Sequence, residues 1–344
     1  MSCCFPKYRR ARREDRYKVK EDAVPPPEIQ IEPPAQTYSW DKRKSVDLSS
    51  YVVANIHGES HKREGDTKDA MQIDNCSEAS VFLLKTTSSV TVDECRECLL
   101  ILGPCSGSVF IRDTSNCVIL TACQQLRLRD CQNVKIAILC PTQAILENSN
   151  DIHFYPLSLH YEGFKNQMKE ANLSLFTNRP KVAHDFTPEG GAKNFTMHNS
   201  FVKIDEKYVD VMARDGISTE TDKSSLLVFK QVPGNKSSIF IYSIRDQDES
   251  LDDFADRVCT FTDILKNVDD LHLINSYDID TKTIDKSLLP IDGDYENIIF
   301  FEVSGEHARI VAVCQENFDI FKVLPEEKLE QMTKLIRAHS SKHD

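Results

Sequence analysis

An internal repeat between residues 73 and 157 constrains the fold of this chain more than any other feature of its sequence. Five segments of one pattern follow one another, and their starts are 19, 19, 17 and 18 residues apart. In each segment a small residue stands three positions after the start, and apolar residues alternate near positions six and eight after it. A period of two inside a longer period predicts strands that stack on one another. The segments start at Ile73, Val92, Ile111, Leu128 and Leu146.

A repeat this short, rich in β-branched and turn residues and without helical periodicity, is typical of a β-helix. Each coil of such a fold buries its inward side chains on the coil below. Neighbouring coils lie about 4.8 Å apart, so equivalent positions become neighbours in space. The fold class predicted for the chain is therefore a β-helix domain followed by a smaller α/β domain.

Several of the twelve cysteines occupy equivalent positions of the repeat. Cys76, Cys95 and Cys131 share one column, and Cys98 and Cys117 share another. These positions face inward, so we predict buried thiols. A zinc site is the weaker interpretation of Cys95-x-x-Cys98, because a tetrahedral site needs a second pair at suitable spacing. We expect no metal and no cofactor.

Composition divides the chain into four parts. A basic tail with a proline-rich spacer covers residues 1–37, and the β-helix domain covers residues 38–188. Residues 189–222 are glycine-containing and polar and are expected to form a linker. Residues 223–344 alternate between strand-like and helix-like patterns and are expected to form the α/β domain.

Two further expectations concern helices and strands. Residues 161–171 are predicted to form a helix that caps the open end of the coil, because a β-helix needs such a cap. The C-terminal pattern favours a ferredoxin-like or nucleoside-diphosphate-kinase-like sandwich. Its predicted strands cover 226–229, 239–244, 271–274, 298–303 and 310–313, and its predicted helices cover 251–268 and the stretch after Pro325.

The charge of the chain is unevenly distributed. The formal net charge is -12, which argues against binding to nucleic acid, whereas the first twenty residues carry eight bases and two acids, or 8 − 2 = +6. Cys3 and Cys4 precede these bases and are candidates for S-palmitoylation, which together with a basic cluster anchors a protein to anionic membrane. An unmodified basic tail is the alternative. No run approaches the roughly 18 apolar residues of a membrane span, so a cytoplasmic location is expected.

The familiar catalytic motifs are absent from the sequence. There is no G-x-x-x-x-G-K-[ST] phosphate loop, no H-E-x-x-H, no G-x-S-x-G and no kinase motif set. We therefore expect no catalytic activity of the chain's own.

One segment of the repeat, residues 121–130, has polar residues at alternate positions. Gln125, Arg127 and Arg129 should share the outer face of a strand. Stacking of the coils should place Phe110 below Arg127 and Ile145 above it, and should align Arg112, Arg129 and Glu147 in a second column. An unpaired arginine among apolar residues is typical of a protein contact surface. The alternative is that both arginines are ordinary outward residues paired with acids.

The sequence resembles the tubulin-binding-cofactor-C domain family. The resemblance covers about residues 38–188 and is carried by YSWD (38–41), LGPCSGSVFIRD (102–113), ACQQLRLRDC (122–131), TQAILENS (142–149) and HDFTP (184–188). It implies a right-handed β-helix. For one branch of the family it also implies activation of GTP hydrolysis by a GTP-loaded Arf-like small GTPase, which releases lipidated cargo at the cilium or ciliary base.

The resemblance also implies roles for individual residues. Arg127 matches an arginine finger and Gln125 the glutamine beside it, so these two are the candidate catalytic residues. The candidate partner-binding residues are Gln124, Phe110, Ile145, Glu147 and Phe186, with Arg129 as structural support.

Two departures from the family pattern stand out. The usual Met-Gly-Cys tip is replaced by Met-Ser-Cys, so Ser2 excludes myristoylation and an anchor at the cytoplasmic face of the plasma membrane must rest on Cys3, Cys4 and the bases. The C-terminal domain stands where part of the family has a nucleoside-diphosphate-kinase-like domain. No motif around His272 or His307 matches the phosphorylated histidine of those kinases, so we interpret this domain as an interaction domain.

Two alternatives to GTPase activation remain at this point. The first is a non-catalytic tubulin-binding or ciliary scaffold that uses the β-helix surface. The second is a phosphotransferase within residues 225–344.

Overall fold

The computed structural model describes most of the chain after its N-terminal tail. The described residues are 48–176, 183–188, 193–226, 238–317 and 320–341. The predicted tail, including Cys3 and Cys4, and the YSWD segment lie outside these residues, as does most of the predicted strand 226–229.

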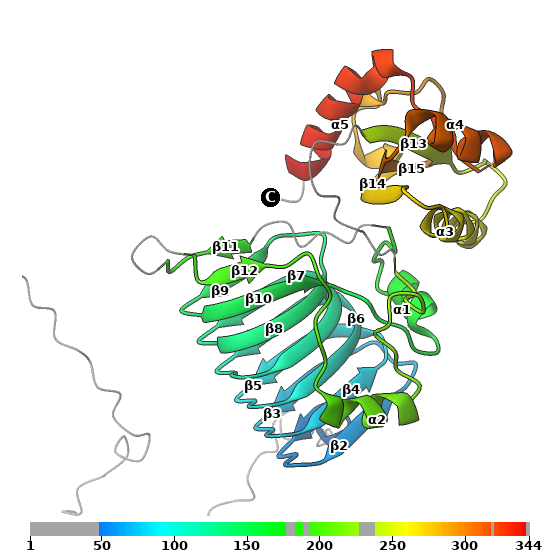
Figure 1. Ribbon diagram of the computed structural model, residues 1–344. Coiled ribbons are helices and arrows are strands. Elements are labelled where there is room, and N and C mark those ends of the chain that lie inside the picture. The colour runs from blue at the N-terminus through cyan, green and yellow to red at the C-terminus, as the bar shows by residue number, and fades with distance from the viewer. Residues whose placement is uncertain (1–47, 177–182, 189–192, 227–237, 318–319, 342–344) are drawn as a thin grey trace, which may run out of the picture. The chain divides into compact units, whose positions relative to one another are not determined.

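Residues 52–156 form a parallel β-helix in which strands stack coil upon coil (Figure 1). We call the outer surface of one set of strands face A and that of the other set face B. The strands of face A are β1 (Val52–Ala54), β3 (Asp69–Asp74), β5 (Thr87–Asp93), the second halves of β6 (Leu99–Arg112) and β7 (Val118–Arg129), β9 (Ala144–Glu147) and β11 (Ala183–Asp185). Those of face B are β2 (Ser60–Glu64), β4 (Ser80–Leu84), the first halves of β6 and β7, β8 (Gln132–Leu139), β10 (Asn150–Pro156) and β12 (Phe195–Met197).

The register of the strands confirms the repeat read from the sequence. The five predicted segment starts, from Ile73 to Leu146, are paired directly with one another along face A. The structure adds one coil before them, because Val53 pairs with Ile73, and a further turn after them, because Asp185 pairs with Leu146.

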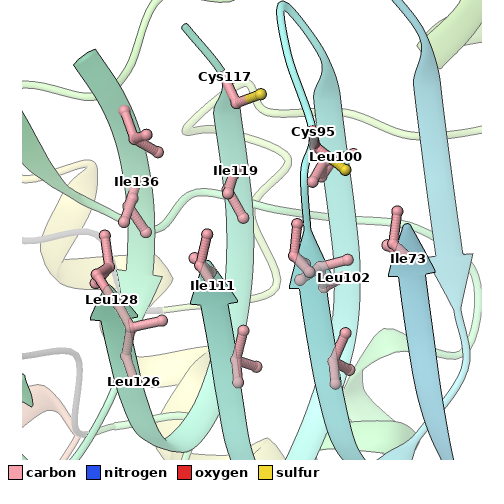
Figure 2. Packing of buried hydrophobic residues seen from close by; sticks show 14 of the residues in the cluster. Ile73, Cys95, Leu100, Leu102, Ile111, Cys117, Ile119, Leu126, Leu128 and Ile136 are labelled. Atoms are coloured by element: carbon pink, nitrogen blue, oxygen red, sulfur yellow. The ribbon is translucent and has the colours of Figure 1, made fainter. Parts of the chain in front are cut away.

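The interior of the coil is apolar and closely packed, and Figure 2 shows Ile111 and Leu128 projecting into it from two successive coils. The five cysteines predicted to face inward are buried there, each without a disulfide. Burial raises the pKa of the Cys131 thiol to about 11, which keeps it protonated at neutral pH. The buried-thiol prediction is confirmed.

Each coil turns at a residue with left-handed backbone geometry. The φ angles at Asn75, Glu94, Asp113, Asp130 and Asn148 lie between 46° and 54°. Asparagine and aspartate tolerate this region because their short polar side chains bond locally. The repeated turn brings the small residue that follows it into the interior, which explains why the third position of each segment is small.

Face B is covered by two helices, α1 (Phe164–Glu170) and α2 (Glu206–Arg214). The outward residues of its strands are themselves apolar, for example Leu99, Ile101 and Leu120, and they pack against Phe164 of α1 and Met212 of α2. The helix predicted near 161–171 is therefore confirmed, but it covers the side of the coil and does not cap its end.

The prediction of a linker over residues 189–222 is wrong for much of that stretch. β12 adds a strand to β10, and Tyr208 and Met212 of α2 are buried against face B. The segment is polar overall because α2 has only one apolar stripe. Average composition does not reveal such a stripe, so the helix was not predicted.

The C-terminal domain is an antiparallel sheet with helices on both of its faces. Within the described residues its strand order is β14 (His272–Asp280), β15 (Asn297–Ser304), β13 (Ser238–Ile244) and β16 (Lys322–Val323). Helices α3 (Leu251–Lys266) and α4 (His307–Glu316) pack on one face, and α5 (Leu329–Ser341) packs on the other. The α/β prediction is confirmed, with three layers in place of the two expected.

One predicted strand of this domain is a helix. Residues 310–313 belong to α4, where Ile310, Val313 and Cys314 are buried at helical spacing. A short apolar run fits a buried strand and a buried helix equally well, and here the helix is formed.

A candidate partner-binding face around Arg127

Face A carries the residues singled out from the sequence. On β7, Leu126 and Leu128 are buried in the interior, so Gln125, Arg127 and Arg129 project outward. Phe110 of β6 and Ile145 of β9 flank Arg127 in register, as predicted. This column thus places an arginine between two apolar side chains on consecutive coils.

A second outward column runs beside the first and contains Arg112, Arg129 and Glu147, again as predicted. The Arg112 Nη2 atom lies 2.5 Å from the Asp93 Oδ2 atom, one coil back. The guanidinium carbons of Arg112 and Arg129 lie 5.4 and 5.7 Å from the centroid of the Phe110 ring, within cation–π range. The charge of Arg112 is therefore balanced by Asp93 within the same face.

The carboxylate partner of Arg129 differs from the one predicted. Its Nε atom lies 3.5 Å from the Asp130 Oδ2 atom, whereas no ion pair joins it to Glu147 within the described residues. The register was right, but Asp130 follows Arg129 directly along the chain and sits closer to its side chain. Glu147 is exposed and its carboxylate points to solvent without an ion-pair partner among the described residues.

The two columns contain three arginines, and Arg127 is the one whose guanidinium has no acidic partner among the described residues. No ion pair, hydrogen bond or ring contact of its guanidinium occurs within the part of the chain that the structure describes. Two nearby acids are already engaged, since Asp93 binds Arg112 and Asp130 binds Arg129, and no ion pair joins Glu147 to Arg127 within the described residues. The alternative of two ordinary, acid-paired arginines therefore describes Arg129 and not Arg127.

The two glutamines of the segment point in different directions. The Ser108 Oγ–H donates to Gln125 Oε1 at 3.2 Å, and the amide N–H groups of Gln125 make no hydrogen bond to the part of the chain that the structure describes. The Gln124 Nε2–H donates to the carbonyl oxygen of Asn172, after α1, at 2.8 Å. Gln124 thus holds the end of α1, and the structure does not bring it to Arg127.

Phe186 reaches the same face from the last turn of the coil. Its backbone N–H donates to the carbonyl oxygen of Leu146 at 2.9 Å, which extends the column of Glu147 by one coil. His184 pairs in register with Ile145 and extends the column of Arg127. Sequence reasoning missed His184, although the alternation His-Asp-Phe would place residues 184 and 186 on one face.

Within the described residues no group of three or more His, Cys, Asp and Glu side chains is arranged to hold a metal ion. None of the helices that the structure describes has the length and apolar character to cross a bilayer.

Residues 68–186 match the protein family described as Tubulin binding cofactor C. The chain carries a tubulin-binding-cofactor-C domain. The matched range contains the whole of the Arg127 face, from Phe110 to Phe186, and leaves out α2 and the C-terminal domain. The family resemblance read from the sequence is thereby confirmed.

This chain is also similar to individual proteins. It is 39% identical to human (Homo sapiens) Protein XRP2 over 231 residues, which are 65% of this chain and 63% of the human protein. It is 44% identical to chicken (Gallus gallus) Protein XRP2 over 163 residues, or 47% and 46% of the two chains. The chain thus spans less than two thirds of the length of these relatives.

A solved structure, Tubulin Binding Cofactor C from Leishmania major, aligns with 51% of this chain and 99% of its own length. The TM-score is 0.30 and the sequence identity 16%, which is too low to inform on function.

Proposed function

We propose that the cofactor-C domain is a GTPase-activating module that inserts Arg127 into the active site of a GTP-loaded Arf-like small GTPase. The observation that carries the proposal is the exposed, unpaired guanidinium of Arg127 on a rigid coil, with Phe110 and Ile145 on either side. A binding surface of this kind, with an arginine at its centre and aromatic and aliphatic neighbours, is enriched in the residues that carry binding energy. The family resemblance supports the same assignment.

The chemistry expected of Arg127 is electrostatic. Transfer of the γ-phosphoryl group from GTP to water spreads negative charge over the transferring oxygens, and a planar guanidinium stabilises that charge through paired N–H donors. The backbone of β7 is fixed by parallel pairing to β6 and β9, so the main-chain position from which the Arg127 side chain projects is preorganised. Gln125, held by Ser108, lies on the same strand face and is expected to contact the GTPase beside the finger.

The remaining residues of the face are assigned to binding. Phe110, Ile145 and Phe186 offer apolar contact, and Glu147 offers a carboxylate that has no ion-pair partner within the described residues. Arg129 supports the face by stacking on Phe110.

The proposal is tested by single-turnover GTP hydrolysis with the purified chain and a panel of Arf-like GTPases. We expect stimulation of at least about 10³-fold with one or a few members, the lower bound usual for an arginine supplied in trans. A scaffold would bind a GTPase or tubulin without changing the rate. Binding without stimulation across the whole panel would therefore favour the scaffold.

Tubulin is the partner named in the description of the matched family, and it provides the second candidate function. An axonemal or ciliary scaffold would use the same outer face without catalysis. Cosedimentation with microtubules, or capture of free tubulin dimers, measures this second function directly. If Arg127 acts on a GTPase alone, Arg127→Ala would leave tubulin binding intact, so comparing the variant with wild type distinguishes the two functions.

We further propose that the N-terminal tail holds the chain at the cytoplasmic face of a membrane, at the plasma membrane or the ciliary base, through palmitate on Cys3 and Cys4. The support is the +6 charge of the first twenty residues beside two cysteines, since one acyl chain or bases alone seldom give stable anchoring. Replacing Cys3 and Cys4 by serine should move the protein from the membrane fraction to the soluble fraction. A Cys259→Ser variant serves as the control, and unchanged fractionation of the double variant would exclude acyl anchoring.

A further inference from the structure

A chain of three hydrogen-bonded side chains lies on face B at the last turn of the coil. Asp151 and His153 belong to β10, and His198 directly follows β12, the strand beside it (Figure 1). The Asp151 Oδ1 atom lies 2.9 Å from the His153 Nε2 atom, and the His153 Nδ1 atom lies 2.9 Å from the His198 Nε2 atom. Two neighbouring strands are therefore joined by a contact between two titratable side chains.

Both of these distances require a hydrogen atom between the two atoms that they join. The Asp151 carboxylate can only accept, so the His153 Nε2 atom carries a proton. Between the two rings, one nitrogen must donate and the other must accept. The histidine pair meets this condition when both rings are neutral or when one of them is charged. It fails when both rings are charged, because every ring nitrogen is then a donor.

The surroundings of the pair disfavour a second positive charge. Burial, followed by the charge of His153, lowers the pKa of His198 below its ordinary value of 6.5. Asp151 can balance one charge but not two. On the neighbouring strand β8, Lys135 is in register with His153 and offers no negative charge. Tyr155 stacks on His198 with 4.3 Å between the ring centroids, and burial raises the pKa of its phenol, so it stays neutral.

The strand that this pair holds is short. Among the described residues, β12 pairs with β10 through three residues and has no strand on its other edge. At its start, the Asn194 carbonyl oxygen accepts the Ile152 N–H at 3.1 Å. At its end, the His198 N–H donates to the Phe154 carbonyl oxygen at 2.8 Å. The histidine pair thus adds a side-chain contact at the end of an edge strand, where fraying begins.

The start of β12 is also tied to β11, the other strand of the last turn. The Asn194 Nδ2–H donates to the Asp185 Oδ2 atom at 2.9 Å and to the Thr187 carbonyl oxygen at 3.0 Å. Asp185 in turn pairs with Leu146 of β9. Loss of β12 from β10 would therefore loosen both strands of the last turn.

We propose that Asp151, His153 and His198 form a pH-sensitive clamp on the last turn of the coil. The clamp is closed while the histidine pair carries at most one positive charge, and it opens when a second proton is bound. Opening separates the end of β12 from β10 and leaves the earlier coils folded. The inference goes beyond the proposed function and uses no property of a GTPase.

The direction of the pH effect follows from the number of protons bound in each form. A histidine released from the pair titrates near its ordinary pKa of 6.5, whereas the closed clamp holds the pKa of His198 lower. Below about pH 6.5 the open form therefore binds more protons than the closed form. The clamp is fully effective above this pH and is lost as the pH falls toward the lowered pKa. Because one proton is taken up, the ratio of open to closed forms rises by at most about tenfold per pH unit.

Amide hydrogen exchange of the full chain between about pH 7.5 and about pH 5 tests the clamp, since histidine switches act near the acidic end of this range. Each exchange rate is divided by the intrinsic rate at the same pH. Protection of the His198 amide should fall about tenfold over the range and should recover when the pH is raised. The Leu99 amide, which donates to the Ala79 carbonyl oxygen at 2.9 Å on an earlier coil, is the internal reference and should stay protected.

Two variants remove the pH dependence by different routes. His198→Phe keeps a ring on Tyr155 but has no proton site, so protection at position 198 should become independent of pH. If this variant is loosened at every pH, His153→Gln provides the second test. A glutamine amide can donate to a neutral ring or accept from a charged one, so the pH dependence should be greatly reduced. His57→Phe, which removes an exposed histidine from the first turn, is the matched control and should behave as wild type.

Asp151→Asn tests the carboxylate. It removes the charge that balances His153, so protection of the His198 amide should begin to fall at a higher pH than in wild type. An unchanged pH profile would remove Asp151 from the clamp.

Three results would overturn the clamp as a whole. The first is constant protection of the wild-type His198 amide over the entire pH range. The second is joint loss of protection at His198 and Leu99, because acid would then unfold the whole domain. The third is a pH dependence that persists in both His198→Phe and His153→Gln. None of these measurements includes a GTPase, so failure of the clamp and failure of the proposed function are separate results.

Discussion

Arg127→Ala is expected to lose about 10³–10⁵-fold of the stimulated hydrolysis rate, or roughly 4–7 kcal/mol of transition-state stabilisation, if the arginine acts as a finger. The variant should fold normally. Arg127 is exposed and its guanidinium makes no ion pair within the described residues, so its truncation should change the free energy of unfolding very little. Single-turnover hydrolysis at saturating activator measures the loss directly.

Binding to the GTP-loaded partner should survive this substitution. Phe110, Ile145, Glu147 and Phe186 remain in place, and together they form most of the proposed contact surface. The expected signature is therefore a lost maximal rate with nearly unchanged half-saturation, which is the mark of an interaction made in the transition state alone.

Two further variants sharpen the result. Arg127→Lys should recover little activity, because an ammonium group cannot reproduce the paired donors of the guanidinium. Arg96→Ala, which removes an exposed arginine from an earlier turn of the β-helix, should behave as wild type. If Arg127→Ala keeps more than about a tenth of the wild-type stimulation, far above what loss of a finger leaves, the finger assignment is wrong and the scaffold function becomes the better explanation.

The β-helix could be predicted to the level of individual strand pairs because its sequence has two nested periods. The alternation of two fixes which side chains face inward, and the longer repeat fixes which coils they meet. A slip of one residue would have turned every buried side chain outward, so the register is strongly specified. The pairing of Ile111 with Leu128, and thus of Phe110 with Arg127, follows from this.

Side-chain partners were less predictable than the register. Arginine has several rotatable bonds, so Arg129 reaches Asp130 on its own coil in preference to Glu147 on the next. The family resemblance grouped Gln124 with Gln125, yet the corner between the two faces of the coil directs it toward Asn172. His184 was missed because residues between the last predicted repeat and β11 interrupt the periodic pattern.

The elements outside the repeat were predicted least well. α2 has few apolar residues and is stabilised by the apolar outer residues of face B, which are far away in sequence. Tertiary contacts of this kind leave little trace in the local pattern. For α4 the local pattern was ambiguous, since Ile310 to Cys314 is a short apolar run that fits either type of element.

Phe154→Ala is expected to destabilise the cofactor-C domain by about 3–5 kcal/mol, the range usual for removal of a buried phenylalanine. The ring is fully buried in the interior of the coil, and it packs edge to face on Phe195 of β12 with 6.2 Å between the centroids. Chemical denaturation of wild type and variant measures the difference.

The loss of stability in Phe154→Ala should also affect β12, outside the interior of the coil. β12 is held to β10 by a short ladder beginning at Ile152 and by the contact of Phe154 with Phe195, so a cavity beneath Phe195 loosens the last turn of the coil. Hydrogen exchange should then accelerate at the His198 amide, which donates to the Phe154 carbonyl. The amides of β3 and β5 should stay protected, with exchange rates no faster than global unfolding of the domain allows.

Phe82→Ala is the matched comparison, since this ring is buried under the helices on face B. It should cost a similar free energy without selective loss of protection at His198. Equal acceleration in both variants would show that the last turn unfolds only with the whole domain.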